Sequence, residues 1–227
     1  MLNTELPIAA NPEPVTESGH PLIVRFFAHL FSYIFHPLFI TFYVCWFIEF
    51  VHPSYFSGFS YAGKKGVLIG FTMNAVLFPL ITALLLKALG FTESIYFRSQ
   101  RDRILLYITS MIFFFWTQLE LRERPEIPRI LVAFMFGVFI SSAAALMANI
   151  YFKISMHAIA MGGLVGICFV IMQQNTMLMT WPLSAAFLIA GLVCTSRFIV
   201  SDHTPKEIYS GLLIGFICQF IGASIHL

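Results

Sequence analysis

Long apolar runs separated by short polar connections fill the chain of 227 residues from about residue 30 to its end. The runs are apolar at nearly every position, which is typical of helices that are apolar on all sides. A helix needs about 20 residues to cross the hydrocarbon of a bilayer. The pattern therefore predicts seven membrane-spanning helices, at about residues 30–51, 67–89, 104–119, 129–151, 156–173, 178–199 and 207–226.

The third and fifth runs are the shortest, so the number of spans falls to six if one of them is a partial or re-entrant element. Residues 1–21 form a polar, acidic tail with no basic region before an apolar run, so no cleavable signal peptide is predicted. The connections are too short to hold a soluble domain. We therefore predict an all-α protein with a single transmembrane helical domain over residues 22–227, with any chemistry within the bundle or at its mouths.

Composition supports a membrane protein and excludes other classes. Hydrophobic residues make up 59% of the chain and charged residues only 11%, whereas soluble domains carry roughly 25% charged residues. The 13 basic and 11 acidic residues nearly cancel, which excludes a nucleic-acid-binding protein that depends on a basic face. The four cysteines lie singly in apolar runs and are interpreted as small core residues, without a metal or disulfide.

Small residues recur at four-residue steps on two of the predicted spans. Gly162 and Gly166 lie on the fifth span, and Gly211 and Gly215 lie on the seventh. Such steps let helix backbones approach closely. We therefore expect spans five and seven to pack inside the bundle.

Polar residues gather on one face of the predicted bundle. If loops alternate between the two sides, the connections after spans two, four and six emerge together with the N-terminal tail. Arginine, lysine, serine and histidine side chains converging at helix ends suit an anionic, phosphate-like ligand. This face carries Arg98, Arg101, Asp102, Arg103, Lys153, Ser155, His157, Arg197, Asp202, His203, Lys206 and Glu207.

The last of these connections resembles a known signature. Ser196 and Arg197 are followed by five residues, then His203, then three residues and Glu207. This spacing resembles the third signature of the type-2 phosphatidic acid phosphatase superfamily, in which the final acid is usually aspartate.

Two further segments complete the resemblance, which covers roughly residues 98–215. Ser155-Met156-His157 is similar to the Pro-Ser-Gly-His of the second signature, although its proline and glycine are missing. The first signature, Lys, six residues, Arg-Pro, has two competing matches. Residues 122–125 contain Arg-Pro but are predicted on the opposite face, so we select the group that contains Arg101 and Arg103.

The resemblance implies a membrane-embedded phosphatase, of a divergent branch, acting on a lipid monophosphate or diphosphate of prenyl or glycerolipid type. It further implies a metal-free mechanism without a cofactor. In that mechanism His203 attacks phosphorus, Glu207 orients the ring, and His157 protonates the leaving alkoxide and then activates water. The phosphate oxygens would be bound by Arg197, Arg103, Arg101, Ser155, the amide of Met156 and Lys153.

Several residues have simpler interpretations. Thr204-Pro205-Lys206-Glu207 also matches a capping box, and we expect Glu207 to act either as a cap or on the histidine ring, not as both. Ser155 suits a helix N-cap, and Arg197 suits an interface anchor. His29 and His36 are seven residues apart, a spacing that puts them on one helical face, and they are weak candidates for haem ligands.

A second functional hypothesis follows from the incomplete first and second signatures: a non-catalytic protein that binds or transports lipid phosphates on the same helices. Membrane lipids are the expected surroundings, and the oligomeric state stays open. We expect a bacterial inner (cell) membrane with the site on the outer face. Connections on the cytoplasmic side of a membrane protein are enriched in lysine and arginine. When the basic residues beside the predicted site are left out, the face that carries the site has three, Arg25, Lys87 and Arg98. The other face has five and is therefore expected in the cytoplasm: Lys64, Lys65, Arg122, Arg124 and Arg129.

Overall fold

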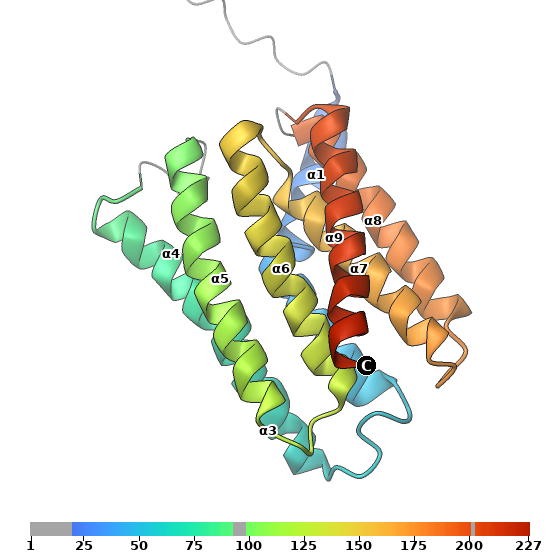
Figure 1. Ribbon diagram of the computed structural model, residues 1–227. Coiled ribbons are helices and arrows are strands. Elements are labelled where there is room, and N and C mark those ends of the chain that lie inside the picture. The colour runs from blue at the N-terminus through green and yellow to red at the C-terminus, as the bar shows by residue number, and fades with distance from the viewer. Residues whose placement is uncertain (1–19, 93–98, 201–202) are drawn as a thin grey trace, which may run out of the picture.

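The computed structural model describes residues 20–92, 99–200 and 203–227, and its regular elements in these ranges are all helices. Figure 1 shows them as one bundle. Two of the elements, η1 and η2, are short π-helical turns that continue a neighbouring helix. The elements are α1 (Leu22–Ile34), α2 (Pro37–Trp46), η1 (Phe47–Val51), α3 (Tyr61–Thr72), η2 (Met73–Leu77), α4 (Phe78–Ala88), α5 (Gln100–Arg122), α6 (Arg129–Tyr151), α7 (Met156–Gln173), α8 (Thr180–Val200) and α9 (Pro205–His226).

Six helices are long and apolar enough to cross a membrane, with α3, η2 and α4 counted as one helix over Tyr61–Ala88. A seventh span is formed if the broken pair Leu22–Ile34 and Pro37–Val51, bent by 58°, crosses as one unit. The prediction of an all-helical membrane bundle with six or seven spans is therefore confirmed, and the chain is interpreted as an integral membrane protein.

The third and fifth spans are both long enough to cross a membrane, so the alternative in which one of them is a partial element does not apply. The third span, α5, has 23 residues because good helix formers extend it at both ends, and the fifth, α7, has 18. The irregular span is the first. Pro37 lacks a backbone N–H and keeps the preceding residue out of the helical region, so α1 ends before His36 and α2 begins at Pro37.

Helices α7 and α9 form the tightest pair in the bundle. A Cβ atom added at Gly162 of α7 would collide with the carbonyl oxygen of Leu212 on α9. A Cβ atom added at Gly215 of α9 would collide with the carbonyl oxygen of Ile159 on α7. Only glycine lets these two backbones approach so closely. The expectation that spans five and seven lie inside the bundle therefore holds for α7, whereas α9 has an exposed outer face that includes Tyr209 and Leu213.

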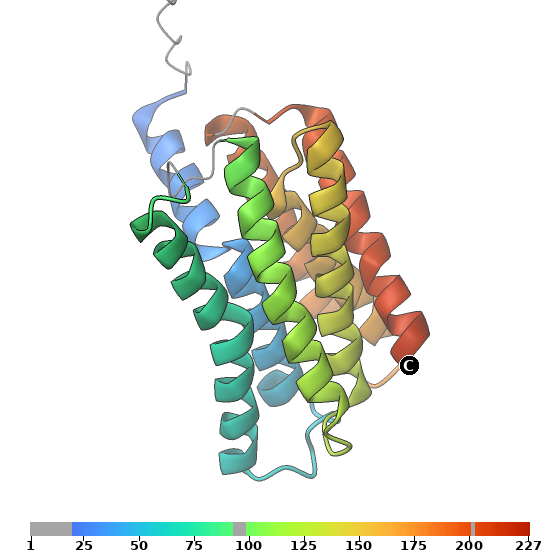
Figure 2. The same ribbon diagram turned by 60° about the vertical axis from the view of Figure 1, so that its left-hand side comes forward.

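The other helices are arranged around this pair. Helix α6 packs against α9, α5 packs on the far side of α6, and α8 packs between α7 and α1. Figures 1 and 2 show that α5 and α9 begin at the same end of the bundle as α1, and that α6 ends there. The C-terminus lies at the opposite end. This arrangement confirms the predicted grouping of the connections on one face, here called the site face.

All four cysteines are buried and free, as expected for core residues. The observed helix bounds also differ from the predicted ones where polar residues next to an apolar run continue the helix. Helix α1, for example, begins at Leu22 because Arg25 and His29 interrupt the apolar pattern without interrupting the helix.

Candidate functional site

His203 and Glu207 form a close pair at the start of α9. His203 Nδ1 lies 2.7 Å from Glu207 Oε2, and the two side chains are only 10% and 16% exposed. In the neutral ring Nδ1 therefore carries the proton and donates a hydrogen bond to the carboxylate, because a carboxylate only accepts. The Nε2 atom of His203 is left with its lone pair, as a nucleophile requires.

Glu207 also caps the helix. Thr204 is the N-cap and Pro205 takes the first helical position, while Glu207 Oε2 accepts the backbone N–H of Thr204 at 3.3 Å. The hydroxyl of Thr204 accepts the backbone N–H of Glu207 in return, at 3.4 Å. The expectation that Glu207 serves one purpose or the other is wrong, because one carboxylate oxygen has lone pairs for both the amide and the ring.

Burial lowers the pKa of His203 below its usual value of 6.5, because desolvation disfavours the charged ring. The hydrogen bond to Glu207 opposes this effect, and the positive charges of Lys153 and Arg197 add to it. The direction favours a neutral His203 at neutral pH, which is the form that attacks an electrophile.

The start of α7 is tied directly to the start of α9. Ser155 is the N-cap of α7, where its Oγ accepts the backbone N–H of Ala158 at 3.4 Å. The backbone N–H of Ser155 donates to the carbonyl oxygen of Glu207 at 3.4 Å. The predicted capping role of Ser155 is confirmed, and the amide of Met156 lies in the first turn of the same helix, where amides favour anions.

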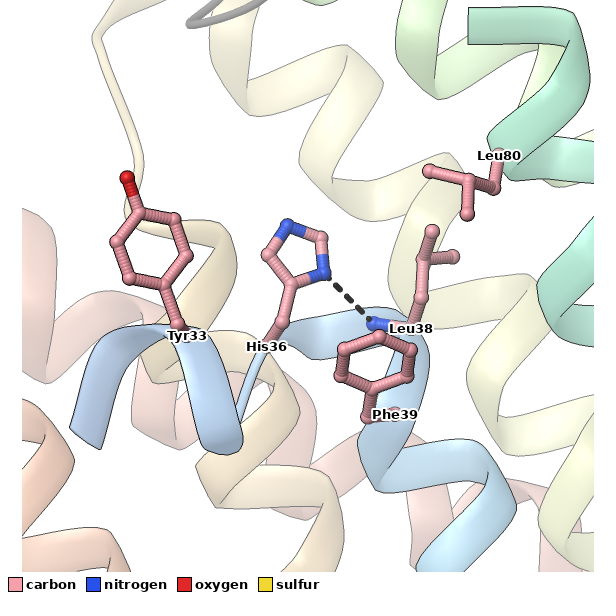
Figure 3. Close-up of a pocket in the computed structure, with 5 residues that line it drawn as sticks. All are labelled: Tyr33, His36, Leu38, Phe39 and Leu80. Atoms are coloured by element: carbon pink, nitrogen blue, oxygen red, sulfur yellow. Dashed lines mark hydrogen bonds between the residues drawn. The ribbon is translucent and has the colours of Figure 1, made fainter. Parts of the chain in front are cut away.

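His157 faces the break in the first span. Its Nε2 lies 3.2 Å from the carbonyl oxygen of Ser32 on α1, and because a carbonyl only accepts, this nitrogen is the donor. The ring of His36 meets the ring of His157 edge to face at 5.6 Å. His36 is the N-cap of α2, where its Nδ1 accepts the backbone N–H of Leu38 at 3.4 Å, as Figure 3 shows.

Two cations complete the cluster. Arg197, half-buried in the last turn of α8, lies close enough to His157, His36 and His203 to influence all three electrostatically. Lys153, in the connection before α7, acts in the same way on His203 and Glu207. The structure thus brings together most of the predicted residues, which we call the site cluster: Lys153, Ser155, Met156, His157, Arg197, His203 and Glu207.

The two arginines of the first predicted signature are placed differently. Arg103 Nε donates to Asn149 Oδ1 at 2.7 Å, which ties α5 to the end of α6, and Arg101 is exposed. Gln100 donates to the carbonyl oxygen of Asn149 at 2.8 Å and strengthens this link. Both arginines lie on the site face, and their role as phosphate ligands stays a prediction.

Two further residues of the predicted site face, and the competing match to the first signature, are less informative. Arg98 and Asp202 lie outside the described residues. The competing Arg-Pro pair, Arg124 and Pro125, lies between the end of α5 and the start of α6, at the end of the bundle away from the site cluster.

Sequence reasoning missed the contribution of the first span. Ser32 and His36 contact His157 across 125 and 121 positions of sequence. The proline after His36 was the available signal, since it marks a helix boundary and therefore a bend. The prediction that His29 and His36 share a helical face is wrong, because the break separates them and leaves His29 exposed.

No group of three histidine, cysteine, aspartate or glutamate side chains that could hold a metal occurs among the described residues. The two hollows described in the bundle lie beside the site cluster. One, lined by Tyr33, His36 and Leu80 among others, is at the break of the first span (Figure 3), and the other lies between α1 and α8. Comparison with protein-family models, with curated proteins and with solved structures finds no match.

Proposed function

We propose that the protein is a membrane-embedded phosphatase that hydrolyses a lipid monophosphate or diphosphate through a phosphohistidine intermediate. The observation that carries the proposal is the His203–Glu207 pair, 2.7 Å apart, with Arg197 and His157 beside it. A histidine held by a carboxylate through one nitrogen presents the other as a nucleophile.

The first chemical step is attack of His203 Nε2 on phosphorus. A bond forms between nitrogen and phosphorus while the bond from phosphorus to the lipid oxygen breaks, and the oxygen leaves with the electron pair. Glu207 supports the positive charge that develops on the ring of His203. His157 takes part as a cation with a proton on each ring nitrogen: Nε2 keeps its hydrogen bond to the Ser32 carbonyl, and Nδ1 donates its proton to the departing oxygen. The lipid therefore leaves as an alcohol, or as a monophosphate when the substrate is a diphosphate.

The second step regenerates the enzyme. His157, now neutral, accepts a proton from a water molecule that attacks the phosphorus of the phosphohistidine. The nitrogen–phosphorus bond breaks, inorganic phosphate leaves, and His203 returns to its neutral form. Both steps pass through a transition state with charge spread over three oxygens, which Arg197, Lys153 and the first amides of α7 are placed to stabilise.

The test is phosphate release from a short-chain lipid phosphate by the purified protein in detergent. We expect turnover by the wild type, with or without a chelator, and none by His203→Ala. His226→Ala, at the opposite end of α9, is the matched control and should remain active. A wild type that binds the lipid phosphate but releases no phosphate would instead support the non-catalytic binding or transport protein.

We further propose that the site face is on the outer side of a bacterial cell membrane. The basic residues remote from the site cluster favour this side. The test uses a cysteine-free variant of the protein into which single cysteines are introduced at Thr16, outside the described residues, or at Gly63 near the start of α3. Intact cells that express each variant are labelled with a membrane-impermeant maleimide. Labelling at position 16 alone supports the proposal, and labelling at position 63 alone contradicts it.

A further inference from the structure

A long apolar groove runs between α1 and α8. Five residues of α1 and seven of α8 line it, and its volume is about 490 Å³, within the roughly 300–1,000 Å³ of small-molecule sites. Its lining is almost entirely aliphatic and aromatic. Several of these side chains are exposed by half or more, including Ile23, Phe187 and Leu188, so the groove opens to the outside of the bundle, where lipid lies.

The groove has the depth of one membrane leaflet. On α8 its lining extends from Phe187 to Ile199. At a rise of about 1.5 Å per residue this stretch is about 18 Å long. Half of a hydrocarbon core of about 30 Å is about 15 Å. A single hydrocarbon chain that starts at the site face would therefore reach the bilayer midplane at the far end of the groove.

Each wall of the groove contains a residue that is next in the chain to a residue of the site or to a contact of the site. On α8, Ser196 lines the groove and Arg197 follows it in the chain. On α1, Ala28 and Phe31 line the groove, and the next residue, Ser32, accepts the hydrogen bond of His157. The groove therefore borders the site cluster on both of its walls.

We propose that this groove holds one hydrocarbon chain of the lipid whose phosphate lies at Arg197 and His203. The identity of the head group rests on the proposed function, whereas the occupant of the groove is argued from its lining, its depth and its position beside the site cluster. The chain is held beside the reacting phosphate, so a lipid with long tails is bound in one orientation.

Gly191 offers a selective way to fill the groove. It lines the groove, and a Cβ atom added there meets no atom within 4 Å, so a larger side chain enters the groove without displacing protein. Gly70 on α3 is the matched control, because a Cβ atom added there also meets open space and this helix does not line the groove. Gly191→Phe and Gly70→Phe should both fold.

The probe is a phosphonate analogue of phosphatidate, which is not hydrolysed, with a diazirine in its acyl chain. Full-length protein in phosphatidylcholine nanodiscs is irradiated, and the labelled residues are mapped by mass spectrometry. We expect labels concentrated on α1 and α8 at the groove in the wild type and in Gly70→Phe. We expect their loss in Gly191→Phe, and an even distribution over lipid-facing helices with a phosphatidylcholine carrying the same diazirine.

Two outcomes would overturn the proposal: even labelling by the phosphonate probe, or equal labelling of the groove by both probes, which would mark an ordinary boundary lipid. Failure of the proposed function is seen separately. Groove labelling in a protein that releases no phosphate retains the groove and rejects catalysis, whereas phosphate release with even labelling retains catalysis and rejects the groove.

Discussion

Because Glu207 both caps α9 and contacts His203, one substitution should lower turnover with little loss of stability, and another should lower stability with little loss of turnover. Oε2 of Glu207 accepts from the His203 ring at 2.7 Å and from the Thr204 amide at 3.3 Å. Glu207→Gln keeps an oxygen acceptor for the amide but removes the charge opposite the ring. Thr204→Ala removes the hydroxyl that caps the helix but leaves the carboxylate in place.

The expected magnitudes differ in opposite ways. Loss of an N-cap side chain costs about 0.5–2 kcal/mol, so Thr204→Ala should lower the unfolding free energy by about 1 kcal/mol, and Glu207→Gln by less. Replacing the carboxylate that orients a catalytic histidine by an amide costs about 10⁴ in rate, so Glu207→Gln should lower kcat by about that factor, which is about 5 kcal/mol in activation free energy. Thr204→Ala should keep turnover close to that of the wild type.

The assay combines phosphate release from a short-chain lipid phosphate with thermal unfolding in the same detergent. A third variant, His203→Ala, checks the coupling: in its background Glu207→Gln should have no further effect on turnover, because residues that act as a unit are not additive. The reasoning is refuted if Glu207→Gln turns over like the wild type while Glu207→Ala unfolds at the same lower temperature as Thr204→Ala. Glu207 would then be a cap alone.

Four further predictions concern the site and the core. Arg197→Lys should lose most of its activity, because a point charge cannot reproduce the paired contacts of a guanidinium; unchanged kcat/KM would make this arginine an interface anchor. Lys153→Met should move the acid limb of the pH–kcat/KM profile to higher pH, because its charge lowers the pKa of His203; a shift to lower pH contradicts the placement. The lowered pKa of His203 also means that the unfolded chain binds more protons just below pH 6.5, so its contribution to stability is lost as pH falls through this range, measurable as a falling melting temperature. Gly162→Ala should destabilise the protein by about 1–3 kcal/mol through its backbone clash, whereas Gly191→Ala, facing open space, should be neutral or stabilising when both are compared by thermal unfolding.

The bundle itself was predictable from the sequence because one physical quantity, the length of apolar helix that crosses a bilayer, determines most of it. The start of α9 was predictable for a similar local reason. Thr204 and Glu207 have capping-box spacing, and His203 and Glu207 are four residues apart, so short-range geometry alone brings them together. The predicted packing of spans five and seven also followed from a local pattern, the repeated glycines.

Contacts between distant segments were not predictable. The bond from His157 to Ser32 depends on how α1 bends at Pro37 and crosses α8, and no local pattern encodes that crossing. The hydrogen bond from Arg103 Nε to Asn149 on a neighbouring helix was not predictable for the same reason. Apolar helices are specified to lie in the membrane, but their association and their choice of neighbours come from close packing and interhelical hydrogen bonds between distant parts of the chain.

The close contact of α7 and α9 at Gly162 and Gly215, here called the glycine seam, has a mechanical consequence. His157 lies in the first turn of one of these helices, and the pair of His203 and Glu207 lies at the start of the other, so the groups proposed to react are carried by two backbones in direct contact. Two helices locked in this way move as one body, and their ends keep a fixed separation. A movement that lets a lipid reach the proposed site must then occur in elements outside the seam. Helix α1, joined to α2 through a break and packed mainly on α8, lies outside the seam and contacts it through the hydrogen bond from His157 to Ser32.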